Sequence, residues 1–123
     1  MRITNRTKYP TPEVDAIVRY AMTGRGRPRY SEAFQAEDRT VDVLPRTSPT
    51  DTREGFTPFD RSQPISLWLE APNRYPEPDA RDPYEELFKS AAHEAWHDRH
   101  PDASCPQCEI RAEGYAHHQW NER

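Results

Sequence analysis

The segment from Asp82 to His100 constrains the fold more than any other, because its sequence predicts one long helix between two prolines. Asp82 and Glu85 form a capping pair at its start, around Pro83. Pro101 ends the helix, since proline supplies no backbone N–H for the next helical hydrogen bond. Six apolar residues recur at the spacing of one helical face, namely Tyr84, Leu87, Phe88, Ala91, Ala92 and Ala95. The rest of the chain therefore has to pack against this stripe.

Length and composition allow one small domain. The chain has 123 residues, of which 33% are hydrophobic, 31% are charged and 13 are proline. A chain of this size buries a single core, and its many prolines predict long irregular loops between the helices and strands. We therefore expect one domain over residues 1–123.

The first half of the sequence predicts two strands and a helix. A strand is expected over residues 2–8, and a helix begins at Thr11 and stops before Gly24, since threonine followed by proline is typical of a helix start. Its inner face is formed by Val14, Ile17, Val18 and Ala21. A second strand is predicted over Thr40–Leu44 by its alternation of polar and apolar residues.

The second half predicts a long loop, a strand and two helices. Residues 45–63 are rich in Pro, Thr, Ser, Asp and Arg, which favours a surface loop. Apolar and other residues alternate over Ile65–Glu70, the period of a strand. A third helix is expected from about Cys108 to Trp120, following the long helix after a short turn.

Charge and hydropathy exclude several classes of partner. There are 17 basic and 21 acidic residues, a net charge of −4, and no Lys/Arg run dominates one segment, so we expect no nucleic-acid partner. No eighteen apolar residues occur together and no export signal is visible, so we expect no membrane partner and a cytoplasmic location. In a reducing compartment, Cys105 and Cys108 are expected to bind metal or to remain free thiols.

The sequence His93-Glu94-Ala95-Trp96-His97 lies in the second half of the long helix and indicates a metal site. Two histidines four residues apart project from one face of a helix, so both imidazoles can reach one ion. A glutamate directly after the first histidine has the role of general base in hydrolysis by metal-activated water. On a helical wheel the two histidines fall opposite the apolar stripe, which argues against a core role for them.

A third ligand is expected from the last predicted helix. Glu109 and Glu113 share one of its faces with Ala112, Ala116 and Trp120. Small alanines allow two helices to approach closely, which would direct both glutamates towards the histidines. We predict Glu109 as the third ligand, with zinc as the ion.

A closed zinc site is the alternative interpretation of the same region. His97, His100, Cys105 and Cys108 have an acceptable spacing for a four-coordinate structural zinc. Such an ion would stabilise a small domain but leave no open position for water. The protein would then be a non-catalytic, zinc-stapled interaction module, and His93 and Glu94 would have no part in metal binding.

The segment AAHEAWH followed by EIRAEGYA resembles the HExxH and ExxA[DE] signatures of gluzincin-like metallopeptidases. The opening residues and ISLWLEAP are similar to compact SprT-like zincins or to zincin domains of phage or actinobacterial type. The resemblance implies a minimal zincin-like α+β domain, with three helices, a small sheet and long Pro-rich loops. It also implies that the strand Ile65–Glu70 edges the cleft and aligns an extended peptide beside the metal. In that family pattern Glu109 binds the ion and Glu113 supports it.

The leading hypothesis from the sequence is therefore a zinc-dependent metallopeptidase that acts on a peptide or protein substrate. His93, His97 and Glu109 would hold the ion, and Glu94 would be the general base. Tyr115 or His118 is the expected donor to the oxyanion. The expected location is the cytoplasm of a bacterium or of a phage-infected host cell.

Overall fold

The computed structural model of the chain describes residues 1–23, 39–48, 50–70, 83–100 and 106–122. Four residues used in the predictions above lie outside these ranges, namely Gly24, Asp82, Pro101 and Cys105. Within them the chain forms one sheet and three helices, which confirms the α+β class.

The sheet has four strands in the order β1-β2-β4-β3. Strand β2 (Thr40–Arg46) lies between β1 (Arg2–Asn5) and β4 (Ile65–Glu70) and is parallel to both. The short strand β3 (Gly55–Phe56) pairs with β4 in the antiparallel direction and forms one edge. The sheet is therefore mixed, and its antiparallel edge is only two residues long.

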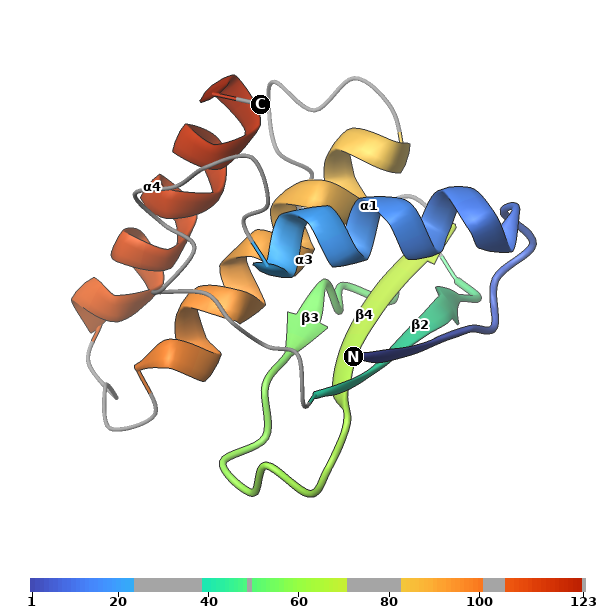
Figure 1. Ribbon diagram of the computed structural model, residues 1–123, viewed down its shortest axis with the longest axis horizontal. Helices are drawn as coiled ribbons and strands as arrows, with labels where there is room; N and C mark the ends of the chain where they lie inside the picture. The colour runs from blue at the N-terminus through green and yellow to red at the C-terminus, as the bar shows by residue number, and fades with distance from the viewer. Residues whose placement is uncertain (24–38, 49, 71–82, 101–105, 123) are drawn as a thin grey trace.

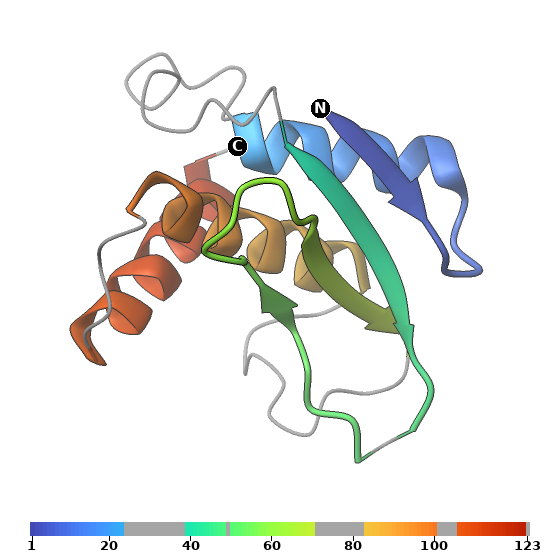
Figure 2. The same cartoon turned by 90° about the horizontal axis from the view of Figure 1, so that it is seen from below.

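Helices α1 (Thr11–Thr23) and α3 (Pro83–Arg99) cover the same face of the sheet. Helix α4 (Pro106–Glu122) packs along α3 at the side of the molecule away from α1 (Figures 1 and 2). Helix α3 contacts α1, α4, β3 and β4. It is the central element of the fold, as expected for the segment with the longest apolar stripe.

The core lies between the sheet and the helices. Alternate residues of β2 and β4 point into it, whereas their neighbours are only partly buried, so each strand has one inner and one outer face. The fully buried members are Val41, Val43, Ile65, Leu67, Leu69, Val14, Val18, Ala21 and Met22. The stripe predicted for α3 meets them, with Leu87, Ala91, Ala92 and Ala95 almost completely buried.

Most predicted boundaries are close to the observed ones, and the differences have local causes. Helix α1 and strand β4 have the predicted bounds. Strand β1 ends at Asn5, before residue 8, because the Asn5 Oδ1 accepts a hydrogen bond from the Thr7 backbone N–H at 2.9 Å and turns the chain. Strand β2 continues to Arg46, whose buried guanidinium donates to the carbonyls of Arg53 and Trp68, both at 2.9 Å.

Two expectations about the sheet edge are wrong. Residues 45–63 contain the strand β3, although a loop was expected there, because two residues are too few to show a periodic pattern. Strand β4, expected to edge the cleft and align a peptide, has no free side, since β2 pairs with one side of it and β3 with the other, and none of its residues lines the cleft. Any edge available to a ligand on this side therefore belongs to β3.

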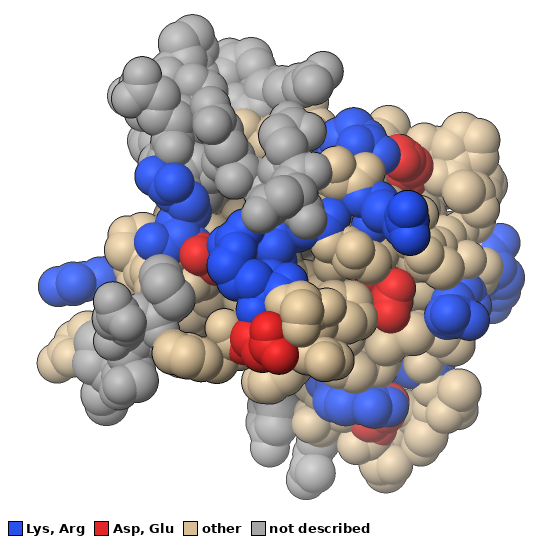
Figure 3. All heavy atoms as spheres, turned by 60° about the horizontal axis from the view of Figure 1, so that its bottom comes forward, with Lys and Arg blue, Asp and Glu red and all other residues tan. Residues whose placement is uncertain are grey.

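The surface carries both signs of charge. On the face shown in Figure 3, groups of Lys and Arg side chains lie beside Asp and Glu side chains. Among the described residues, no helix has the length and apolar character needed to cross a bilayer.

Candidate metal centre

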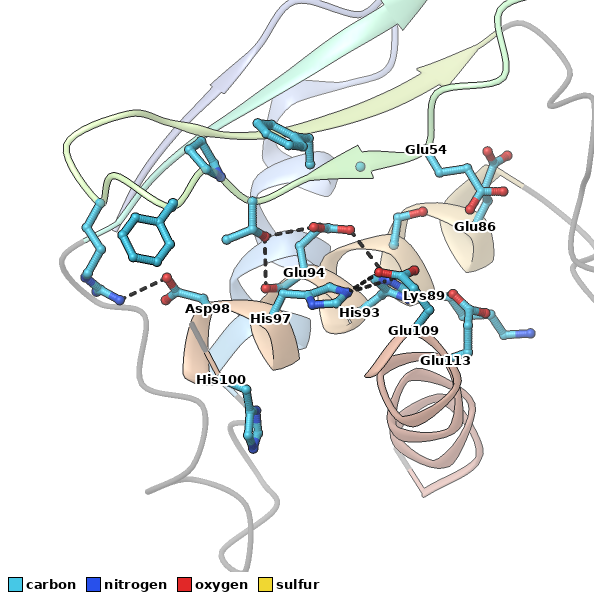
Figure 4. A pocket seen from close by; sticks show the side chains of 17 residues that line it. Glu54, Glu86, Lys89, His93, Glu94, His97, Asp98, His100, Glu109 and Glu113 are labelled. Carbon is cyan, nitrogen blue, oxygen red and sulfur yellow. Dashed lines mark hydrogen bonds and ion pairs between the residues drawn. The ribbon is translucent and has the colours of Figure 1, made fainter. Parts of the chain in front are cut away.

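Helix α3 presents its metal motif to two different neighbours. His93 and His97 face α4, and Glu94 faces β3 and the loop that follows it (Figure 4). The helix is buried on every side from Ala91 to Trp96, so the wheel argument that excluded the histidines from the interior is wrong for His93, which is 8% exposed. The reason is that α4 and β3 cover the face opposite the apolar stripe.

Helix α4 reaches the histidines because its contact face is made of small residues. Ala112 and Ala116 are buried against α3, at 0% and 1% exposure, and Cys108 is also buried. Near the other end of α4, Trp120 packs edge-on against Phe88 of α3, with ring centroids 5.3 Å apart. This packing places Glu109 and Glu113 beside the histidines, on the face predicted from the sequence.

Three side chains converge on one point. The Nε2 atoms of His93 and His97 are 3.1 Å apart. Of the two carboxylate oxygens of Glu109, Oε2 lies 3.1 Å from His93 Nε2, and Oε1 lies 2.7 Å from His97 Nε2. These three side chains are thus close enough together to hold one metal ion. These three are the metal-ligand set formed by the described residues.

Glu113 occupies a different position from Glu109. Its Oε1 lies 2.5 Å from Nδ1 of His93, on the side of the imidazole away from the Nε2 cluster. A carboxylate at the second nitrogen of a ligand histidine fixes the tautomer and the ring orientation. Glu113 and Glu109 therefore contact different ring nitrogens of His93.

Glu94 is held by the segment that follows β3. Its Oε1 accepts a hydrogen bond from the Thr57 hydroxyl at 2.8 Å, and the same hydroxyl lies 3.2 Å from the Glu94 carbonyl oxygen. Gly55 lies so close that a Cβ there would be 2.9 Å from both Cγ and Oε2 of Glu94. The carboxylate Oε2 is 3.9 Å from His93 Nε2, near the ligand cluster without belonging to it.

The electrostatics of the site follow from burial among carboxylates. Burial raises the pKa of the Glu94 carboxyl to about 7, against the opposing effects of His93 and the Thr57 hydroxyl. For His93, burial disfavours the charged ring, but Glu113 and the neighbouring acids outweigh it and raise the pKa to about 9. Burial and the nearby His93 lower the pKa of His97.

A cleft of about 360 Å³ runs past these groups, between β3 with its following loop and the helices α3 and α4. One wall comes from residues 54–59 and Arg61, and the other from α3 and α4. The wall from α3 and α4 is lined by Glu86, Lys89, Ser90, His93, Glu94, His97, Asp98, His100, Glu109 and Glu113. The ligand cluster and Glu94 are therefore accessible from one open space.

The alternative closed site is not assembled by the described residues. His100 stacks on Trp96, with ring centroids 4.0 Å apart, and its Nδ1 lies 2.8 Å from the Trp96 carbonyl oxygen. Cys108 is disulfide-bonded, so the expected free or metal-binding thiol is not present there, because a sulfur in a disulfide is not a thiolate ligand. The fourth predicted member, Cys105, lies outside the described residues.

The two residues suggested as oxyanion donors do not line the cleft. Tyr115 packs against the hydrophobic core, and its hydroxyl oxygen is buried. The His118 Nε2 lies 4.0 Å from Glu122 on α4. Both residues lie on α4, but the helical rotation at these positions turns them away from the histidines of α3.

Sequence reasoning missed Gly55, Thr57 and Asp98 as residues of the cleft. The first two lie in a segment interpreted as a surface loop, and their contacts with Glu94 span 37 or more residues of sequence. A hydroxyl residue and a glycine within a Pro-rich stretch carry no signal of such a contact. Asp98 directly follows the second histidine, and that position was the only available indication.

No protein-family model, curated protein or solved structure matches this chain. The resemblance to zincins therefore depends on the residues and the geometry described above.

Proposed function

We propose that the protein is a zinc-dependent hydrolase of peptide bonds with a minimal zincin-like arrangement. The observation that carries the proposal is the convergence of His93, His97 and Glu109 on one point, with the Glu94 carboxylate beside it. Two histidines and one carboxylate are a common ligand set for catalytic zinc, because three protein ligands leave a fourth position open.

Each side chain has a distinct task in this proposal. His93, His97 and Glu109 would hold the ion, and Glu113 would orient His93 through its Nδ1 atom. When bound, zinc would lower the pKa of a water molecule and polarise the scissile carbonyl. Glu94 would accept the proton of that water and pass it to the nitrogen of the leaving amine. The Thr57 hydroxyl keeps the Glu94 carboxylate on the cleft side.

The outer edge of strand β3 favours a peptide as the proposed substrate. Gly55 and Phe56 pair with Leu67 and Ser66, and the Trp68 N–H donates to the Glu54 carbonyl at 3.0 Å. Hydrogen-bonded and non-hydrogen-bonded pairs alternate along an antiparallel ladder, so the backbone groups of Gly55 are directed away from β4. An extended peptide could pair with this edge directly over Glu94.

The first experiment is a comparison of zinc binding with peptide hydrolysis. Glu94→Gln should bind zinc as tightly as the wild type, while kcat falls by about 10²–10⁴, since the general base is lost. His97→Ala should lose both zinc and activity. Glu122→Gln on the exposed end of α4 is the matched control and should change neither.

Full peptide hydrolysis by Glu94→Gln would remove that residue from the mechanism. Failure of the wild type to bind zinc, measured by titration against a chromophoric chelator, would overturn the whole proposal.

A further inference from the structure

The loop after β3 is fastened to α3 at two points one helical turn apart. Thr57 contacts both the side chain and the carbonyl of Glu94, as described above. Arg61 follows Thr57 by four residues, and Asp98 follows Glu94 by four. Arg61 Nη1 donates a hydrogen bond to Asp98 Oδ1 at 2.9 Å. Residues 58–60 are therefore held between two attachments to the helix that carries the metal motif.

The buried Arg39 contacts both residues of the second attachment, Arg61 and Asp98. The Asp98 side chain is only 4% exposed, and its Oδ1 also lies 3.4 Å from Nε of the buried Arg39. Arg39 in turn donates from Nη1 to the carbonyl of Arg61 at 2.7 Å. Both the side chain and the backbone of Arg61 are thus fixed, and the loop has little freedom to move away from the cleft.

This fastened loop presents an apolar residue to the cleft. Phe59 is 83% exposed, although it lines the cleft with its neighbour Pro58. The large hydrophobic residues most exposed among those described are Phe56, Phe59 and Ile110, and the first two line this cleft. A single exposed phenylalanine is common on protein surfaces, so its position and its two anchors carry the argument.

Phe59 lies only a short stretch of chain beyond β3. Phe59 follows Gly55 by four residues, at most about 13 Å of extended chain. A peptide paired with β3 over Glu94 would therefore pass Phe59 within a few residues of the bond being hydrolysed.

We propose that Pro58 and Phe59 form a subsite for an apolar side chain of the substrate, aromatic or branched aliphatic, near the scissile bond. The inference rests on the proposed function, because it assumes that a peptide lies along β3. Phe59 supplies the main contact surface in this subsite. The attachments of Thr57 and Arg61 to α3 set its distance from the metal ligands.

Binding measured without turnover tests this subsite separately from catalysis. The protein is the full chain with Glu94→Gln, loaded with zinc, and the probes are short alanine-based peptides that each carry one Phe at a different position. One position of Phe should tighten binding about tenfold or more over the all-alanine peptide, as expected when one large apolar side chain packs against Phe59. Adding Phe59→Ser should remove that gain and leave the affinity for the all-alanine peptide unchanged.

Ile110→Ser is the matched control, because Ile110 is 72% exposed on α4 and does not line the cleft. It should retain the preference for Phe. Equal affinities for all peptides, no binding of any peptide, or a preference that survives Phe59→Ser would each overturn the subsite. Selective binding by the Glu94→Gln protein together with no hydrolysis by the wild type would instead overturn the proposed activity and leave the subsite standing.

Discussion

At the scale of single residues, Glu113 would act on the proposed metal ion without binding it. Its carboxylate contacts the nitrogen of His93 that faces away from the ligand cluster. Removing it would leave all three ligands in place but free the imidazole to rotate and to change tautomer. Its contribution should therefore appear in the affinity for zinc more than in the identity of the ligands.

Glu113→Ala should weaken zinc binding by about 10–100-fold, the usual effect of losing such a partner of a ligand histidine. Competition with a chromophoric chelator measures this affinity directly. Glu122→Ala, which removes an exposed carboxylate from the same helix, is the control and should leave the affinity unchanged. An unaltered affinity in Glu113→Ala would show that the carboxylate does not orient His93.

Gly55 has no side chain, and this absence leaves room for the side chain of Glu94. A Cβ at this position would come within 2.9 Å of the Glu94 side chain, too close for the carboxylate to stay where it is. Gly55→Ala should therefore displace Glu94 and lower kcat, while zinc affinity, which depends on other residues, is retained. Parallel measurement of hydrolysis and of zinc binding separates the two effects. Wild-type kcat in this variant would contradict the close packing.

Gly114 is the matched control for Gly55, since a Cβ there would meet nothing within 4 Å. It lies inside α4, where glycine is less favourable than alanine by roughly 0.5–1 kcal/mol. Gly114→Ala should raise the free energy of unfolding by about that amount and leave activity unchanged. Urea denaturation gives the value, and a loss of stability would show that the helix is strained at this point.

At the scale of elements, the contact between α3 and α4 decides whether a ligand set exists. Ala112 is completely buried in this contact and leaves no room for a larger side chain. Ala112→Leu should cost about 1–3 kcal/mol of stability through overpacking. It should also weaken zinc binding, because moving α4 outward carries Glu109 away from the histidines of α3.

Arg111→Leu places the same side chain on the exposed side of α4 and should change stability by no more than about 0.5 kcal/mol. Thermal unfolding and zinc titration of both variants provide the comparison. Unchanged zinc affinity in Ala112→Leu would show that Glu109 does not depend on close helix packing.

The elements also show what the sequence could and could not predict. Helices α1 and α3 were predictable because prolines, caps and a 3.6-residue period mark them, and the period of two marks β4. The face of α4 that carries Glu109 and Glu113 was predictable because Ala112 and Ala116 on the same face allow close packing against α3. Strand β3 was not predictable, since its two residues have no period and its place depends on pairing with β4. The contacts of Gly55 and Thr57 with Glu94 depend on that pairing.

At the scale of the whole molecule, zinc would add a second link between two helices that already pack through small residues and the Phe88–Trp120 pair. Its ligands come from α3 and α4, and Glu109 is 67% exposed, so little other packing fixes its side chain. An ion that binds the folded state alone stabilises it, by about 2.7 kcal/mol at a hundredfold excess over Kd. Zinc should thus add to the stability of the entire fold.

Thermal unfolding with and without zinc measures this linkage. The wild-type Tm should rise as zinc is added and fall when a chelator removes it, in proportion to the logarithm of free zinc. His97→Ala should show no such dependence. A Tm that is independent of zinc in the wild type would contradict a site that bridges the two helices.

The residues that line the cleft all fall between Glu54 and Glu113, so none comes from β1 or α1. The two parts of the chain should therefore tolerate mutation differently. Substitutions inside β1 or α1 would act through abundance and folding yield, whereas substitutions at positions 56 and 58–60 would alter which peptides are chosen while the core and the two loop attachments stay intact. An engineer seeking a new specificity would diversify that short loop and leave the first strand and helix untouched.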